Sequence, residues 1–156
     1  MKVAESKHTI RFPDCDPYNH LNNSRYLDYF INAREDHLAQ FYNFEPYKYA
    51  KETGKSWVVG QNQIAYLTPA ALMEKVVIQS SILELNESDI LVEMTMWDEA
   101  KTRLKSFLWT KFVHVDLKAL KRVHHDAFIM DTFSKYVNAL EPDVSFEQRL
   151  AEVKKK

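Results

Sequence analysis

The sequence is poor in glycine: its 156 residues contain only two, Gly54 and Gly60. Loops of the Rossmann or P-loop type need several glycines at fixed spacing, because their backbone must approach the nucleotide phosphates closely. These nucleotide-binding classes are therefore excluded.

Cysteine is nearly absent, since Cys15 is the single one. One cysteine cannot form an intramolecular disulfide, which fits a reducing compartment. The first residues lack the apolar core of a signal peptide, and no apolar run approaches the length of a transmembrane helix. We therefore expect a cytoplasmic protein that does not span a membrane.

Neither sign of charge dominates, because 21 basic residues face 22 acidic ones and the net charge is -1. So small and evenly spread a charge indicates neither nucleic acid nor a membrane surface as a general partner. The length and the apolar fraction of 46% are those of a globular protein with its own core. We expect a single domain over residues 1–156.

The chain does contain a regular order of hydrophobic patterns. Loose alternation predicts a short strand at residues 7–12, and apolar residues at helical spacing predict a long helix from about residue 23 to 43. A helical turn is expected at 45–53, closed by Gly54. Short polar turns then separate four strand-like segments, which indicates antiparallel hairpins. These segments are residues 56–67, 75–85, 90–97 and 103–115.

The C-terminal part reads as helical, at about residues 126–140 and 145–154. Ser145 and Gln148 form the pattern of a capping box at the start of the second segment. The whole order predicts an α+β fold, in which an antiparallel sheet of five to six strands wraps around one long central helix. Its core is expected at about 7–118, with a C-terminal helical extension at about 122–156.

One charged residue interrupts the apolar face of the long helix. Arg34 projects near the middle of this face, with His37 toward its edge. A buried charge is costly unless it is paired. We therefore expect Arg34 to form a buried ion pair with the preceding loop, which carries Asp14 and Asp16.

That loop is the main candidate for a functional site. It carries Asp14, Asp16 and His20, and it ends in the pair Asn22-Asn23, which is suited to a helix N-cap. The free N–H groups and the positive dipole end of a helix N-terminus favour negative charge. Such a loop can stabilise an oxyanion beside a general base. From the residues alone, an equally good interpretation is that both aspartates only form Asx turns.

Two other candidate sites are rejected. Cys15 stands beside two carboxylates, which disfavour the thiolate that a nucleophilic cysteine needs. His124 and His125 are adjacent and lack a compact set of further ligands, so a surface or helix-cap role is preferred to a metal site.

The pattern Asp14-x-Asp16-x-x-x-His20-Leu21-Asn22-Asn23-x-x-Tyr26 resembles that of the hotdog-fold thioesterases, which include the 4-hydroxybenzoyl-CoA thioesterase-like enzymes and the plant acyl-ACP thioesterases. Three further segments match the family in the correct order: Phe30-x-x-Ala33-Arg34, Tyr66-Leu67-x-Pro69-Ala70 and Val113-x-Val115-Asp116. The chain departs from the family at Met73-Glu74, where a Gly-Asp pair is usual, and at Tyr18, where the acyl-ACP enzymes carry Asn.

The resemblance implies a hotdog fold and an acyl-thioester hydrolase that needs no metal or organic cofactor. Asp16 would act as general base or nucleophile, the Asn23 amide as oxyanion donor, and His20 as an assisting group. The family pattern also places three residues beside the substrate and two in structural support. The former are Tyr18, Asn22 and Tyr26, and the latter are Asp14 and Arg34.

The implied substrate is an acyl-CoA or acyl-carrier-protein thioester. The implied assembly is a homodimer or homotetramer with active sites at the subunit interface. Two alternatives remain open: a non-catalytic hotdog domain that binds acyl-CoA or another protein, and, more weakly, a hotdog hydratase or dehydratase, whose glycine- and proline-rich loop signatures are absent.

Overall fold

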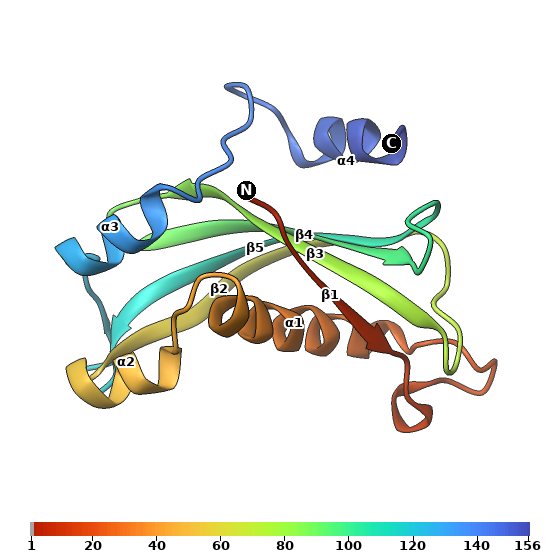
Figure 1. The fold of residues 1–156 in the computed structure, drawn as a ribbon, viewed down its shortest axis with the longest axis horizontal. Coiled ribbons are helices and arrows are strands. Elements are labelled where there is room, and N and C mark those ends of the chain that lie inside the picture. The colour runs from red at the N-terminus through yellow and green to blue at the C-terminus, as the bar shows by residue number, and fades with distance from the viewer. Residues whose placement is uncertain (1) are drawn as a thin grey trace.

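The computed structural model describes residues 2–156 and contains one antiparallel sheet (Figure 1). Its strands run in the order β1-β3-β4-β5-β2, and β6 pairs with β5 outside this path. The strands are β1 (Ala4–Thr9), β2 (Lys55–Tyr66), β3 (Lys75–Leu85), β4 (Asp89–Asp98), β5 (Leu104–Asp116) and β6 (Lys121–Arg122). The helices are α1 (Tyr26–Gln40), α2 (Pro46–Thr53), α3 (Ala127–Ser134) and α4 (Phe146–Lys154).

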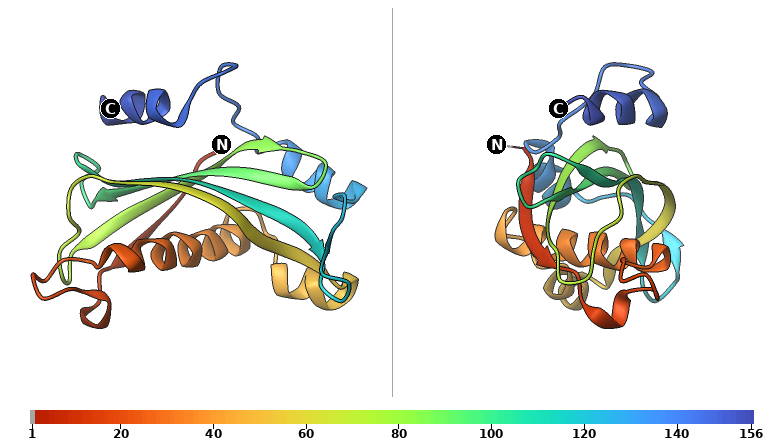
Figure 2. Two further views of the ribbon diagram at one scale, coloured as in Figure 1. Left: turned by 180° about the vertical axis from the view of Figure 1, so that it is seen from behind. Right: turned by 90° about the vertical axis from the view of Figure 1, so that its right-hand side faces the viewer.

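The sheet curls around α1, which lies against its inner face (Figure 2). Tyr26, Phe30 and Ala33 recur at helical spacing on α1 and are buried in the main core. Burying a side chain as large as Phe contributes about 1.5–3 kcal/mol. The apolar pattern that predicts the helix is therefore also what attaches it to the sheet.

The outer face of the sheet is covered in part by α4 (Figures 1 and 2). Phe146 and Val153 of α4 pack against a second apolar cluster on the strands, which includes Trp97 and Phe107. Arg149 donates two hydrogen bonds to the buried Glu93 of β4, at 2.8 and 2.9 Å. Charge pairing and apolar contact therefore hold α4 on the sheet together.

Most predicted elements are present, with shifted ends. The first strand ends at Thr9 rather than at residue 12, because Phe12–Asp14 form a 3₁₀ turn that contains Pro13. Gly54 closes α2 with a φ of 73°, and the capping box at the start of α4 is formed. The short β6 was not predicted, and α3 ends at Ser134, well before residue 140.

The prediction that Arg34 pairs with the loop of Asp14 and Asp16 is wrong. Arg34 is buried, at 5% exposure, but its Nη1 donates to Tyr42 Oη at 3.1 Å and to Ser80 Oγ at 2.8 Å. Within residues 2–156 it forms no salt bridge. The reason is distance: Arg34 lies roughly 12 Å along α1 from its first residue, at 1.5 Å per residue, and the loop lies beyond that end.

His37 continues this buried polar row. Its Nδ1 lies 2.6 Å from Ser80 Oγ and its Nε2 lies 2.8 Å from Ser6 Oγ. The row therefore links α1 to β3 and to β1. Burial, reinforced by the positive charge of Arg34, lowers the pKa of His37 to about 4.

No helix in the described part of the chain is long and apolar enough to cross a membrane.

The low pKa of His37 predicts a pH-dependent stability. The unfolded chain binds a proton at this imidazole below about pH 6.5, whereas the folded protein does so only near pH 4. The unfolded state thus binds more protons in this window, so stability falls as the pH drops through it, by on the order of 2–3 kcal/mol at His37. Urea unfolding of His37→Gln between pH 4 and 7 is expected to show a shallower dependence than the wild type.

His124→Gln is the matched control, because the side chain of His124 is 76% exposed and should have little effect on the slope. The same slope in His37→Gln and in the wild type would contradict the assignment. His8, His114 and His125 also have pKa values lowered by burial, so part of the slope remains in every variant.

Candidate active site

The loop between β1 and α1 lies beside the segment that precedes β3, and backbone hydrogen bonds join the two. The Ile10 N–H donates to Glu74 O at 2.9 Å, and the Leu21 N–H donates to Ala70 O at 2.7 Å. A third bond runs the other way, from the Leu72 N–H to Asn19 O at 2.8 Å. The candidate site is therefore held at both of its ends.

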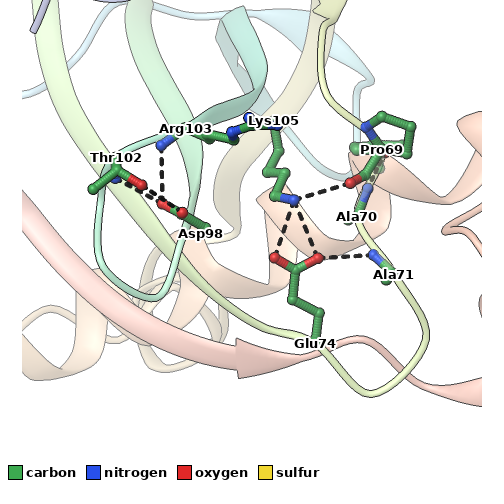
Figure 3. A network of polar contacts seen from close by, with 9 residues as sticks. Pro69, Ala70, Ala71, Glu74, Asp98, Thr102, Arg103 and Lys105 are labelled. Carbon is green, nitrogen blue, oxygen red and sulfur yellow. Dashed lines mark hydrogen bonds and ion pairs between the residues drawn. The ribbon is translucent and has the colours of Figure 1, made fainter.

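A buried ion pair stabilises the supporting segment (Figure 3). The Lys105 ammonium on β5 lies 3.0 Å from Glu74 Oε2 and donates to Pro69 O at 3.0 Å. Glu74 Oε1 also accepts the Ala71 N–H at 2.9 Å. Lys105 thus fixes both ends of the segment against which the candidate loop rests.

Met73 explains how this turn forms without the family's usual glycine. Its φ is 66°, in the left-handed region that glycine adopts without steric cost. Met73 is also exposed, so its side chain contributes little burial. The turn therefore contains one residue in the left-handed conformation, and Met73 adopts it at a steric cost.

Asp16 forms an Asx turn with one carboxylate oxygen, and its other oxygen remains available for a catalytic role. Its Oδ1 accepts the backbone N–H groups of Tyr18 and His20, at 2.9 and 3.1 Å. Its Oδ2 accepts no hydrogen bond from any residue in the range 2–156. The carboxylate is thus fixed by one oxygen while the other is free to act on a substrate or a water.

Asn22 and Asn23 begin the helical segment as predicted. Asn22 is the N-cap of the 3₁₀ turn Asn23–Arg25, and its Oδ1 accepts the Ser24 N–H at 3.0 Å. The backbone N–H of Asn23 has no acceptor in the described chain. A free N–H at a helix N-terminus is a suitable donor to a developing oxyanion.

His20 and Tyr18 present their side chains to solvent. Both residues are exposed, Tyr18 at 81%, and neither side chain makes a hydrogen bond to the described protein. The backbone of His20 is fixed, because it accepts the Asp16 N–H and bridges to Ala71. Both side chains are therefore available to a ligand.

Tyr26 lies beneath the site. It is 2% exposed, its hydroxyl accepts the Ala70 N–H at 3.2 Å, and its ring packs edge-on against Tyr66. The structure therefore places Tyr26 in the core, where it supports the Ala70 backbone that holds the loop.

Asp14 is attached to the helix by Tyr29, a residue that the sequence analysis missed. The Tyr29 hydroxyl donates to Asp14 Oδ2 at 2.6 Å and accepts the Arg11 N–H at 3.0 Å. Burial and the bond to Asp14 raise the pKa of Tyr29 to about 12, so the hydroxyl keeps its proton. Tyr29 therefore does what Arg34 was expected to do.

Cys15 and His125, which the sequence analysis rejected as a nucleophile and a metal ligand, have surroundings that suit a structural role. Burial, Asp14 and Asp16 raise the pKa of the Cys15 thiol, which disfavours the thiolate. His125 is buried rather than on the surface: its Nδ1 lies 2.8 Å from Asn86 O, and its Nε2 accepts the Trp57 indole N–H. Residues 2–156 contain no group of three His, Cys, Asp or Glu side chains that could hold a metal ion.

One short loop therefore carries a carboxylate with a free oxygen, a free N–H at the start of the helical segment and an exposed imidazole. A curled antiparallel sheet around a long helix is the architecture of the hotdog fold. The family description "Thioesterase-like superfamily" matches residues 10–146, and the chain belongs to this family. The predictions of family, hotdog fold and thioester-hydrolase class are confirmed.

Individual relatives agree with this assignment. The long-chain acyl-CoA thioesterase FadM of Escherichia coli (strain K12) is 29% identical over 112 residues, which are 72% of this chain and 83% of FadM. Among solved structures, a DHNA-CoA thioesterase from Staphylococcus aureus has a TM-score of 0.80 at 16% identity, covering 86% of this chain and 91% of that one. Another S. aureus protein, solved in complex with CoA, has a TM-score of 0.80 at 12% identity, with 94% and 91% covered.

The ion pair under the loop generates a stability prediction. The side chains of Lys105 and Glu74 are 8% and 23% exposed, so Glu74→Gln leaves a buried ammonium without its counter-charge. We expect a loss of about 2–3 kcal/mol in the free energy of unfolding, measured by urea denaturation. Glu99→Gln is the control, because its pair with Lys7 at 3.6 Å is exposed and should contribute less than about 1 kcal/mol. Equal losses in the two variants would contradict the proposed role of the buried pair.

Proposed function

We propose that this protein hydrolyses acyl-CoA thioesters at the loop between β1 and α1. The observation that carries the proposal is that one short loop holds both a free Asp16 Oδ2 and a free Asn23 N–H. An acyl-CoA substrate is supported by the relative FadM, whose name states that activity. An acyl-carrier-protein thioester remains the alternative.

The proposed reaction begins when the carbonyl oxygen of the thioester accepts the Asn23 N–H. Asp16 then removes a proton from a water that attacks the carbonyl carbon, or its Oδ2 attacks that carbon directly. In both routes the C–S bond breaks, and the CoA thiolate leaves and is protonated. In the second route, water afterwards hydrolyses the acyl anhydride on Asp16. His20 is positioned to orient the water or the carbonyl through its free imidazole.

The Asx turn supports this role of Asp16. Two backbone N–H groups hold Oδ1, so the carboxylate does not lose rotational freedom when it acts. Asn22 and Tyr18 flank the same loop and are proposed to contact the CoA portion. Asp14 supports the loop through Tyr29. The proposal includes no metal or organic cofactor and keeps a cytoplasmic location.

We further propose a homodimer formed along β2. One edge of β2 pairs with β5, and the other pairs with no strand in the described structure. Val58 and Val59 are exposed on this strand, and such an open edge invites a second strand.

Asp16→Asn tests the hydrolase. Asparagine keeps an oxygen for the two backbone N–H groups, so the fold should persist while the base or nucleophile is lost. Thiol release from a panel of acyl-CoAs should fall by about 10²–10⁴-fold. Asp28→Asn, an exposed carboxylate on α1, is the control. Equal activity in Asp16→Asn and the wild type would mean that Asp16 is not the catalytic carboxylate. CoA binding without turnover in the wild type would favour the binding domain.

Val59→Lys tests the dimer. A lysine on the open edge of β2 should repel a second copy and give a monomer by light scattering at micromolar concentration. If the active site lies at the interface, thiol release should fall with it. Phe128→Lys is the control, since it replaces an exposed apolar side chain on α3, away from this edge. A wild type that is already monomeric would refute the dimer.

A further inference from the structure

An apolar cavity of about 260 Å³ lies between the second half of α1 and the inner face of the sheet. Its walls come from α1, α2, β2, β4, β5 and α3, and aromatic side chains dominate them. Phe44, Trp57, Phe112 and Phe133 contribute four of these rings. A cavity with such walls suits the hydrocarbon or aryl part of an acyl group.

The cavity opens beside β2. Of its lining residues, Glu35, Tyr47 and Val59 are exposed and so mark its mouth, and the Tyr47 hydroxyl donates to Glu35 Oε1 at 2.9 Å. The mouth therefore lies at the edge where the proposed dimer forms.

One of the residues that line this apolar cavity carries a charge. Arg34 is nineteen-twentieths buried, at 5% exposure, and it lines this space. Of its three guanidinium nitrogens, only Nη1 has acceptors in the described protein, namely Tyr42 Oη and Ser80 Oγ. Within residues 2–156, the one fully enclosed side-chain polar atom without a partner is Thr110 Oγ1, so Nε and Nη2 of Arg34 are not fully enclosed. Because Arg34 lines the cavity, we infer that these two donors are open to it.

The positive charge of Arg34 is not neutralised within residues 2–156. It forms no salt bridge, and its neighbour His37 stays uncharged, because burial and Arg34 itself lower the pKa of that imidazole. The Tyr42 ring, 4.7 Å from the guanidinium carbon, offsets part of the cost. Two unused donors on a buried cation form a ready site for an acceptor oxygen.

We propose that this cavity receives the end of the acyl group remote from the thioester, and that Arg34 donates a hydrogen bond to an oxygen there. The preferred substrates are thus acyl thioesters with a hydroxyl or carboxylate at the far end. The inference rests on the proposed thioesterase function and adds a specificity-determining residue to it.

We infer that the acyl group runs from one site to the other along one face of the helical segment that begins at Asn23. Asn23, Leu27 and Ile31 follow one another at a spacing of four residues, and the last of these lines the cavity. From Asn23 to Arg34 the helix rises by roughly 17 Å at 1.5 Å per residue. The acyl group that spans this distance is long, so the advantage of a terminal oxygen should appear at one chain length and vanish in short acyl groups.

The first experiment measures kcat/KM of the wild type on matched CoA thioesters of increasing length, each ending in methyl, hydroxyl or carboxylate. Removing a single acceptor from a charged hydrogen bond corresponds to about a 10–100-fold change. We expect an advantage of this size for an oxygenated end at the optimal length. Hydroxyl and carboxylate arms distinguish a neutral from an anionic ligand. Turnover with equal or better rates for methyl-ended chains at every length would overturn the inference and leave the hydrolase intact.

Arg34→Met then removes the donors and keeps much of the side-chain volume. The advantage of the oxygenated end over the methyl end should disappear, chiefly through KM. Ile31→Met, which alters the same wall without removing a donor, should retain the advantage. A folded Arg34→Met protein that also keeps it would overturn the assignment. If Arg34→Met does not fold, the wild-type length series decides.

Binding measurements test the role of Arg34 independently of the proposed hydrolase activity. Thioether analogues, S-alkyl-CoA molecules with methyl, hydroxyl or carboxyl ends, cannot be hydrolysed and are titrated by calorimetry. Tighter binding of the oxygenated analogues by a wild type without thioesterase activity would support Arg34 and refute the hydrolase. Equal binding of all three analogues at every length would refute the role of Arg34.

Discussion

The burial of two polar side chains on the inner face of α1 determines how the sheet and the helix fit together. Arg34 and His37 point into the core, where unpaired polar groups are costly, so strands with hydroxyl groups must lie opposite. Ser80 in the middle of β3 bonds both residues, and Ser6 of β1 bonds His37. An apolar face alone would let the helix slide over the strands, whereas these hydrogen bonds define one register and therefore one position for the helix N-terminus.

That position matters because the candidate chemistry lies where the helix begins. The loop before α1 is joined to the segment before β3 at Leu21 and Ile10, and to the helix itself through Asp14 and Tyr29. Asp16 stands between these attachments, with one carboxylate oxygen held by the backbone. A rigid frame with one free oxygen and one free N–H needs little rearrangement before reaction, and such preorganisation contributes most to electrostatic catalysis.

The sequence correctly predicted most helices and strands and which of their faces are buried. It did not predict which side chains contact one another across the fold. The ends of β3, Lys75 and Leu85, were predicted without error, since a polar turn at residues 86–89 follows this segment. Arg34 was correctly assigned to the core, but a helical pattern does not tell which strand lies opposite, so Ser80 was not foreseen. α3 ends early because Asn138 donates to Ile82 O of β3 at 2.7 Å, a long-range bond that no local pattern contains. Tyr29 was missed because its hydroxyl acts through the fold, across fifteen residues, on Asp14.

The helix on the outer face has a consequence for how copies of this chain can assemble. Through Phe146 and the Arg149–Glu93 pair, α4 occupies the surface over Trp97 and Phe107 that would otherwise be open for stacking against another sheet. The middle of the sheet is thus a closed three-layer sandwich of α1, strands and α4. In the dimer proposed above, contact between copies is therefore expected at the edge of the sheet, strand beside strand. The C-terminal extension thereby reduces the outer sheet surface that is open to a second copy, as well as completing the fold.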